Sequence, residues 1–171
     1  MLRELAQIVL AIHLSLSPQQ HLPEKLIQYY ATEIQAGGNS TEVDPLIFVA
    51  IITHESQWRS NAISPDQQDW GLMQVRGKYY SGGQHNDWLL NPHTNIQVGA
   101  YLIKKSMEYC TSKLDRQPLP QEWLSIYQGS GFGCKPTKLT KLFEDYYLCL
   151  KEDVENPTDD VTDYKKIYWH E

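Results

Sequence analysis

Glu55 is the side chain in this sequence with the clearest chemical potential, because it follows an unbroken apolar run. Seven apolar residues occupy positions 46–52, too many for one stripe of a helix, so we expect a helix that is buried on all sides. Asp44 can cap this helix, and Pro45 suits its first turn. Glu55 would then lie about one turn beyond the run, where burial and the negative end of the helix dipole both raise a carboxyl pKa.

A raised pKa lets a carboxyl group hold a proton near neutral pH and give it to a leaving oxygen, as a general acid does. A plainer interpretation is that Glu55 caps the helix end or pairs with Arg59, since structural networks also perturb carboxyl groups. Helix chemistry alone leaves both interpretations open. The chemistry to test is acid–base catalysis at this carboxyl group.

Four short motifs occur in an ordered series around Glu55. They are HES at 54–56, GLMQV at 71–75, NPHTNIQVGA at 91–100 and IYQG at 126–129. In order and spacing they resemble the lytic transglycosylase and goose-type lysozyme superfamily, whose helix reads "NP..NI..G" and whose later segment reads "YN.G". The resemblance covers roughly residues 44–133, and four ordered motifs are far more specific than an isolated Glu-Ser pair.

This resemblance implies cleavage of the β-1,4 bond between N-acetylmuramic acid and N-acetylglucosamine in peptidoglycan, with Glu55 acting first as acid and then as base. One carboxyl group can suffice in a lytic transglycosylase, because the substrate's N-acetyl group assists and its own 6-hydroxyl attacks, leaving a 1,6-anhydro end. No metal or cofactor is implied. Hydrolysis would usually recruit a second carboxylate, and Asp69 and Asp66 are the candidates.

Asp69 is the better candidate for a second carboxylate, because residues 69–74 resemble the "D.G.MQ" form found in transglycosylases of secretion and conjugation systems. An Asp that stabilises a turn is an equally good interpretation. In goose-type lysozyme an aspartate follows the Met-Gln-Val segment, where this chain has Arg76. The resemblance therefore favours a transglycosylase. The alternatives are a lysozyme-type muramidase that uses Asp69 and a non-catalytic glycan-binding or scaffold module.

The family motifs also imply four substrate-site residues: Ser56, Met73, Gln74 and Tyr127. The first three would contact sugar, and Tyr127 would hydrogen-bond to Glu55 and orient it. Structural alternatives remain open, because Ser56 and Gln74 could serve backbone groups and Met73 could fill the core. The family motif continues after its tyrosine with Asn, whereas here Gln128 follows, a departure that affects the expected lower wall of the cleft.

Composition restricts the class of protein. A net charge of −6 argues against nucleic acid as a partner, and no stretch reaches the ~18 apolar residues of a membrane span. Three cysteines, Cys110, Cys134 and Cys149, lack paired zinc spacing and allow at most one disulfide. Residues 2–16 lack a small-residue cleavage site, so we expect mature structure there rather than an export signal. Peptidoglycan strands as the partner would place the protein in the periplasm or outside the cell.

The elements that must position Glu55 are predicted to be helices. Apolar spacing predicts helices over 2–16, from about 23 to a glycine pair at 37–38, from 91, from 120, and from about 136 with Leu139 and Leu142 on its apolar face. The segment 151–163 is acidic and is expected to be loop-like, and 167–169 could dock onto the domain. A small hairpin or an irregular loop would lie beside the cleft.

With 171 residues and 41% hydrophobic content, the chain fits one packed domain. We therefore predict a mainly α, single lysozyme-like domain over 1–171. It would contain a motif core at 44–133, scaffold helices at 1–38, and a C-terminal helix with an acidic tail at 136–171. We expect a monomer, and a secretion or conjugation apparatus is a further partner suggested by the resemblance.

Overall fold

A computed structural model describes residues 2–79, 86–129 and 133–157 of this chain. The helices are α1 (Leu2–Ser15), α2 (Glu24–Thr41), α3 (Pro45–Ser56), α4 (Pro92–Leu114), α5 (Pro120–Tyr127) and α6 (Lys138–Glu155). Between α3 and α4 lie the antiparallel strands β1 (Asp69–Trp70) and β2 (Val75–Arg76) and the 3-10 turns η1 (Gly77–Tyr79) and η2 (Asp87–Leu90). The predicted mainly α architecture with a small hairpin is confirmed.

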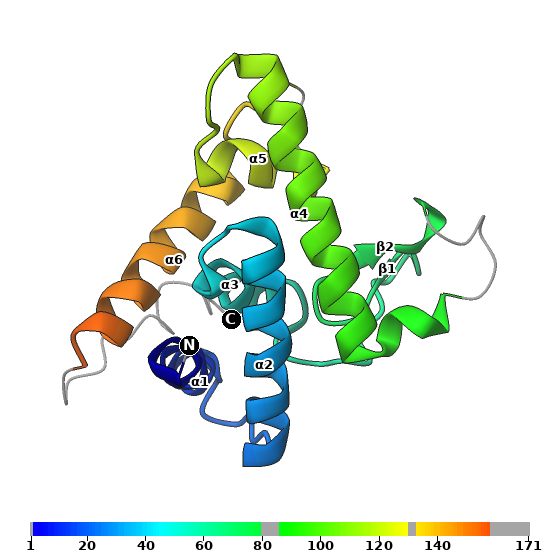
Figure 1. Ribbon diagram of the computed structural model, residues 1–171. Helices are drawn as coiled ribbons and strands as arrows, with labels where there is room; N and C mark the ends of the chain where they lie inside the picture. Colours follow the sequence, from blue (N-terminus) through cyan, green and yellow to red (C-terminus); the bar gives the residue numbers. More distant parts are fainter. Residues whose placement is uncertain (1, 80–85, 130–132, 158–171) are drawn as a thin grey trace.

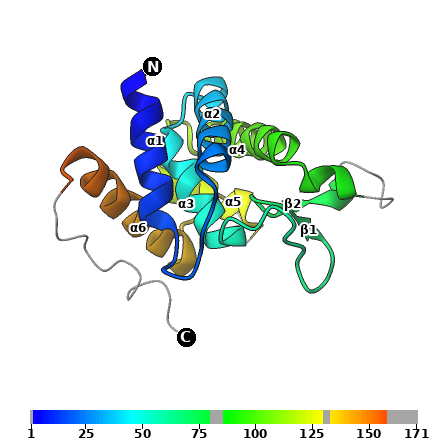
Figure 2. The same ribbon diagram turned by 90° about the horizontal axis from the view of Figure 1, so that it is seen from below.

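Helix α3 lies in the middle of the molecule and packs against α1, α2 and α6, with the hairpin at one side (Figures 1 and 2). Residues 46–53 are all buried, so the prediction of a helix without an exposed face is confirmed. Asp44 caps it as expected, because its Oδ1 accepts from the backbone N–H of Leu46 at 3.0 Å. Its Oδ2 accepts from Tyr147 at 2.8 Å and from Lys151 at 2.9 Å, which ties the start of α3 to α6.

Helix α2 continues through Gly37 and Gly38, where the sequence predicted its end. A Cβ on Gly37 would lie 3.0 Å from the ring of Phe48, and one on Gly38 would lie 2.8 Å from Pro45. The two glycines therefore allow α2 to approach α3 closely. The helix ends instead at Thr41, and the following residue, Glu42, has a left-handed φ of 60°. The predicted end was wrong because the glycines serve packing between helices.

Helix α6 buries a face that differs in part from the predicted one. Phe143 and Leu150 are buried, but Leu139 and Leu142 are each 40% exposed. The buried positions are 140, 143, 146, 147, 150 and 154, a stripe that begins one residue later than predicted. Helix α6 also includes 151–155, which the sequence assigned to a loop-like tail, and the predicted docking of 167–169 lies outside the described residues.

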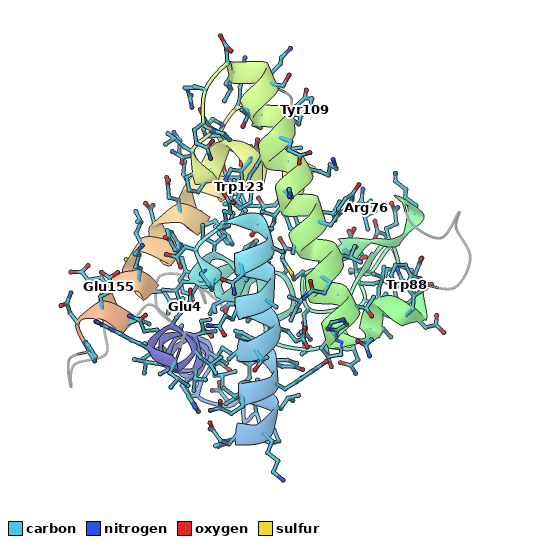
Figure 3. All side chains as sticks on the ribbon, in the orientation of Figure 1. Glu4, Arg76, Trp88, Tyr109, Trp123 and Glu155 are labelled. Carbon is cyan, nitrogen blue, oxygen red and sulfur yellow. A yellow bond between two sulfur atoms is a disulfide. The ribbon has the colours of Figure 1, made fainter. Side chains whose placement is uncertain are left out.

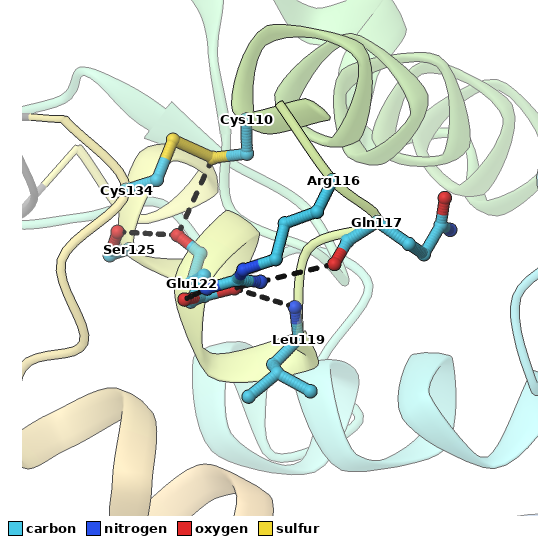
Figure 4. The surroundings of a disulfide bond; sticks show 7 residues. All are labelled: Cys110, Arg116, Gln117, Leu119, Glu122, Ser125 and Cys134. Carbon is cyan, nitrogen blue, oxygen red and sulfur yellow. Dashed lines mark hydrogen bonds and ion pairs between the residues drawn. A yellow bond between two sulfur atoms is a disulfide. The ribbon is translucent and has the colours of Figure 1, made fainter. Parts of the chain in front are cut away.

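An ion pair holds α5 near the end of α4, and a disulfide joins α4 to the segment between α5 and α6 (Figure 4). Cys110 on α4 is bonded to Cys134, and Cys149 is free, so the three cysteines form the one disulfide that the sequence allowed. Glu122 on α5 accepts from both terminal nitrogens of Arg116, at 2.8 and 2.6 Å. These bonds hold a helix of only eight residues in place, and the chain that follows it leads into the site.

Candidate active site

Glu55 lies in the last turn of α3 and is half-buried. Burial raises its pKa from the usual 4.5 to about 7, a hydrogen bond from Gln128 acts in the opposite direction, and the charge of Asp69 raises it further. The direction predicted from the apolar run is confirmed. Near neutral pH both forms of this carboxyl group are populated, so it can give up a proton and take one back.

Among the described residues, Gln128 forms a side-chain hydrogen bond with Glu55. It follows the last residue of α5, and its Nε2 donates to Oε1 of Glu55 at 3.4 Å. The sequence predicted this role for Tyr127, but the Tyr127 hydroxyl donates to the backbone oxygen of Met73 at 2.9 Å. A phenol has one proton to donate, and Tyr127 donates it to the turn between β1 and β2. The sequence signal that could have identified this role of Gln128 is that it stands where the family motif has Asn.

Asp69 is paired with Arg76 across the hairpin, where the two residues are register partners. Arg76 donates from Nε to Oδ1 at 2.9 Å and from Nη2 to Oδ2 at 3.0 Å, and Figure 3 shows Arg76 at the hairpin beside α4. Both carboxylate oxygens of Asp69 therefore accept from one guanidinium. The other candidate, Asp66, is exposed and accepts from Ser64 at 2.6 Å, as a turn-forming Asp does.

Ser56 and Met73 are fully buried at 0% exposure, which fits the structural alternatives for these two residues, and their contact with sugar stays a prediction. The Ser56 hydroxyl donates to the backbone oxygen of Ile52 at 3.2 Å. The Met73 side chain packs on Gly99, where any Cβ would collide with its sulfur. Gln74 is half-buried, and its amide nitrogen donates to two backbone oxygens, at 2.9 and 3.3 Å. Its contact with sugar stays a prediction.

Asn95 of the third motif holds the hairpin turn on α4. It is fully buried, its Oδ1 accepts from the backbone N–H of Met73 at 2.7 Å, and its Nδ2 donates to the backbone oxygens of Trp70 and Leu89 at 2.7 and 2.8 Å. Gly71 has a φ of 75°, and a side chain there would collide with Asn95. The glycine and asparagine motifs therefore fix the hairpin turn on α4 rather than supply reacting groups.

Neither a membrane-spanning helix nor a metal cluster occurs in the described ranges. No helix there is both long and apolar enough to cross a membrane, and no group of three His, Cys, Asp or Glu side chains could hold a metal ion. The arrangement around Glu55 consists of one perturbed carboxyl group, the amide of Gln128 and the carboxylate of Asp69 in its ion pair with Arg76.

Comparison with protein families gives a match to the family described as transglycosylase SLT domain, over residues 32–126. Comparisons with curated proteins and with solved structures gave no match. The family match covers more than half of the chain, runs from α2 into α5, and includes Glu55, Asp69 and Asn95. This supports lytic activity on peptidoglycan and a lysozyme-like helical fold, as the motifs predicted. The chain therefore belongs to the transglycosylase SLT domain family.

Proposed function

We propose that this protein is a peptidoglycan lytic transglycosylase that cleaves the β-1,4 bond between N-acetylmuramic acid and N-acetylglucosamine with Glu55 as its one catalytic carboxyl group. The observation that carries the proposal is the pKa of about 7 on a half-buried carboxyl group at the end of α3. Such a group is protonated often enough to act as an acid and ionised often enough to act as a base.

The reaction needs only one proton carrier. Protonated Glu55 gives its proton to the glycosidic oxygen, and the bond from that oxygen to the anomeric carbon of N-acetylmuramic acid breaks. The Glu55 carboxylate then takes the proton of the 6-hydroxyl, whose oxygen bonds to the same anomeric carbon and closes the 1,6-anhydro ring. Glu55 ends protonated as it began, and no water is consumed.

The ion pair between Asp69 and Arg76 favours this route over hydrolysis. A hydrolase would use its second carboxylate to activate water or to attack the sugar, but both oxygens of Asp69 already accept hydrogen bonds from Arg76. The charge of Asp69 still raises the pKa of Glu55, so its contribution is to keep Glu55 protonated. That same proximity makes a lysozyme-type muramidase using Asp69 the second candidate.

A non-catalytic glycan-binding or scaffold module explains the site less well. Burying a carboxyl group that must ionise costs stability, and binding sugar does not require a group with a pKa near neutrality. The pKa of about 7 at Glu55 is useful to a general acid and of no use to a scaffold.

A substrate of peptidoglycan strands places the protein in the cell envelope, and a disulfide such as Cys110–Cys134 persists in oxidising compartments outside the cytoplasm. We further propose that residues 1–171 form one domain that works as a monomer. Association with a secretion or conjugation apparatus would extend this proposal, and co-purification from the native envelope would test it.

The product of digestion tests the proposed function directly. Purified sacculi are digested, and the muropeptides are analysed by mass spectrometry. We expect anhydro ends, which weigh one water less than hydrolytic ends. Glu55→Gln should abolish cleavage, because general acid–base catalysis contributes about 10²- to 10⁴-fold, while Asp66→Asn in the exposed turn serves as a control that keeps activity.

Other outcomes would point elsewhere. Reducing ends as the main product would assign hydrolysis, and Asp69→Asn should then be nearly as damaging as Glu55→Gln. Cleavage by Glu55→Gln within about ten-fold of the parent would remove Glu55 from its role. Binding of glycan strands without any cleavage would support the scaffold module.

A further inference from the structure

Gln128 is half-buried, and in the described part of the chain its side-chain amide forms a hydrogen bond through its nitrogen but not through its oxygen. Its Nε2 donates to Oε1 of Glu55 at 3.4 Å, whereas its own Oε1 is buried and has no partner within the part of the chain that the structure describes. The backbone N–H of Gln128 is satisfied separately, by the oxygen of Leu124 at 2.9 Å. Buried polar atoms nearly always have partners, so this oxygen needs an explanation.

Direct contact with substrate does not explain the unused oxygen of Gln128, because that atom is buried. A carboxamide has nearly the same shape after a half-turn about its last carbon–carbon bond, which exchanges its donor and its acceptor. With the amide of Gln128 reversed, its oxygen would face Glu55. It could then accept a hydrogen bond from the protonated carboxyl group.

The two forms of Glu55 need opposite partners. A carboxylate only accepts hydrogen bonds, while a carboxylic acid has one proton to donate. Tyr127 does not offer a proton, because its hydroxyl donates to Met73. Asp69, the charged group that acts on Glu55, is held by Arg76. Among these groups, the amide of Gln128 can serve both forms without leaving its place at the end of α5.

We propose that Gln128 is the positioning residue of Glu55, donating to the carboxylate and, with its amide reversed, accepting from the carboxylic acid. Its part in the reaction rests on the proposed function. The coupling between the two side chains can nevertheless be measured in the free protein, so the inference and the proposed function can fail separately.

The first test is an NMR titration of the free protein. The side-chain amide signals of Gln128, identified by their loss in Gln128→Met, should shift with pH at the same midpoint as the carboxyl carbon of Glu55, and this response should disappear in Glu55→Gln. Gln121 is a matched control, because it lies on α5, the helix that Gln128 follows, and also has a buried side-chain oxygen without a partner among the described residues. Its signals should not follow Glu55. Gln128 signals that stay constant through the Glu55 titration would overturn the inference.

The second test compares Gln128→Met with Gln121→Met in the lysis of sacculi as a function of pH. The hydrogen bond from Gln128 lowers the pKa of Glu55, and a bond to the ionised carboxylate is stronger than one to the neutral acid. Loss of both bonds should therefore raise the pKa of Glu55 and move the alkaline limb of the rate profile to higher pH. Loss of orientation should also lower the maximal rate, by up to about 10²-fold if the carboxyl group shifts by about 1 Å. Gln121→Met should change neither. A similar rate loss in both variants with an unmoved alkaline limb would mean that Gln128 is merely structural.

These experiments can refute the two proposals separately. If Glu55→Gln still cleaves sacculi, the proposed function fails whatever the titration shows. If Glu55→Gln is inactive but the amide signals of Gln128 do not shift as Glu55 ionises, only the positioning role of Gln128 is refuted.

Discussion

Replacing Glu55 with Gln should stabilise the folded protein at alkaline pH, although it removes the catalytic acid. The pKa of Glu55 is about 7 in the folded protein, against 4.5 for a solvated glutamate. Between these values the folded protein binds more protons than the unfolded chain, so the free energy of unfolding falls as pH rises through this window. Each unit of pKa difference corresponds to about 1.4 kcal/mol, so the loss above pH 7 amounts to about 3 kcal/mol.

Glutamine has nearly the same shape and does not ionise, so Glu55→Gln avoids this loss. The variant should match the wild type closely below pH 4.5, where Glu55 is protonated in both states, and should be more stable by about 3 kcal/mol well above pH 7. Urea unfolding at these two pH values measures the difference, and comparison between them cancels any change that is independent of pH.

Glu152→Gln on the exposed side of α6 is a matched control, which should show no comparable gain. If the stability gain of Glu55→Gln does not grow with pH, burial does not raise the pKa of this carboxyl group. The argument for a general acid at this position would then lose its main support.

Three further predictions concern the surroundings of the site. Asp69→Asn should keep anhydro ends as the main product and move the alkaline limb of the rate profile to lower pH, because the charge of Asp69 raises the pKa of Glu55; a switch to inactivity would contradict this. Tyr127→Phe should cost about 1 kcal/mol in urea unfolding through its lost hydrogen bond, with a modest loss of activity. Replacing Cys110 and Cys134 with Ser should cost about 3 kcal/mol, given their separation of 24 residues, and an unchanged unfolding midpoint under oxidising conditions would show that no disulfide forms.

Local pattern was sufficient to predict α3, its cap and the character of Glu55. Seven apolar residues in a row cover all sides of a helix, so such a helix keeps them from water only if it is buried all round. A carboxyl group one turn later is then poorly solvated, and its raised pKa follows from the same segment. The start of α4 at Asn91 and Pro92 was equally local, since the Asn91 side chain accepts from the backbone N–H of Thr94 at 3.1 Å.

At other positions, packing between elements gave a structure that differs from the one the local pattern predicted. Gly37 and Gly38 have the composition of a helix end, but they lie within α2 because a neighbouring helix occupies the space where their side chains would be. Ser56 and Met73 belong to motifs that suggested sugar contacts, yet both point into the core. A motif identifies a residue as part of a fold and does not tell which way its side chain faces.

The sequence by itself determined that a helical SLT domain presents one poorly solvated carboxyl group, because burial and charge along a single helix are local properties. Only the tertiary structure decided which side chains lie around that carboxyl group. Gln128 reaches Glu55 from 73 residues away, and Arg76 forms an ion pair with Asp69 because a hairpin brings them into register. Such pairings depend on how elements pack in three dimensions, and no periodicity within one element encodes them.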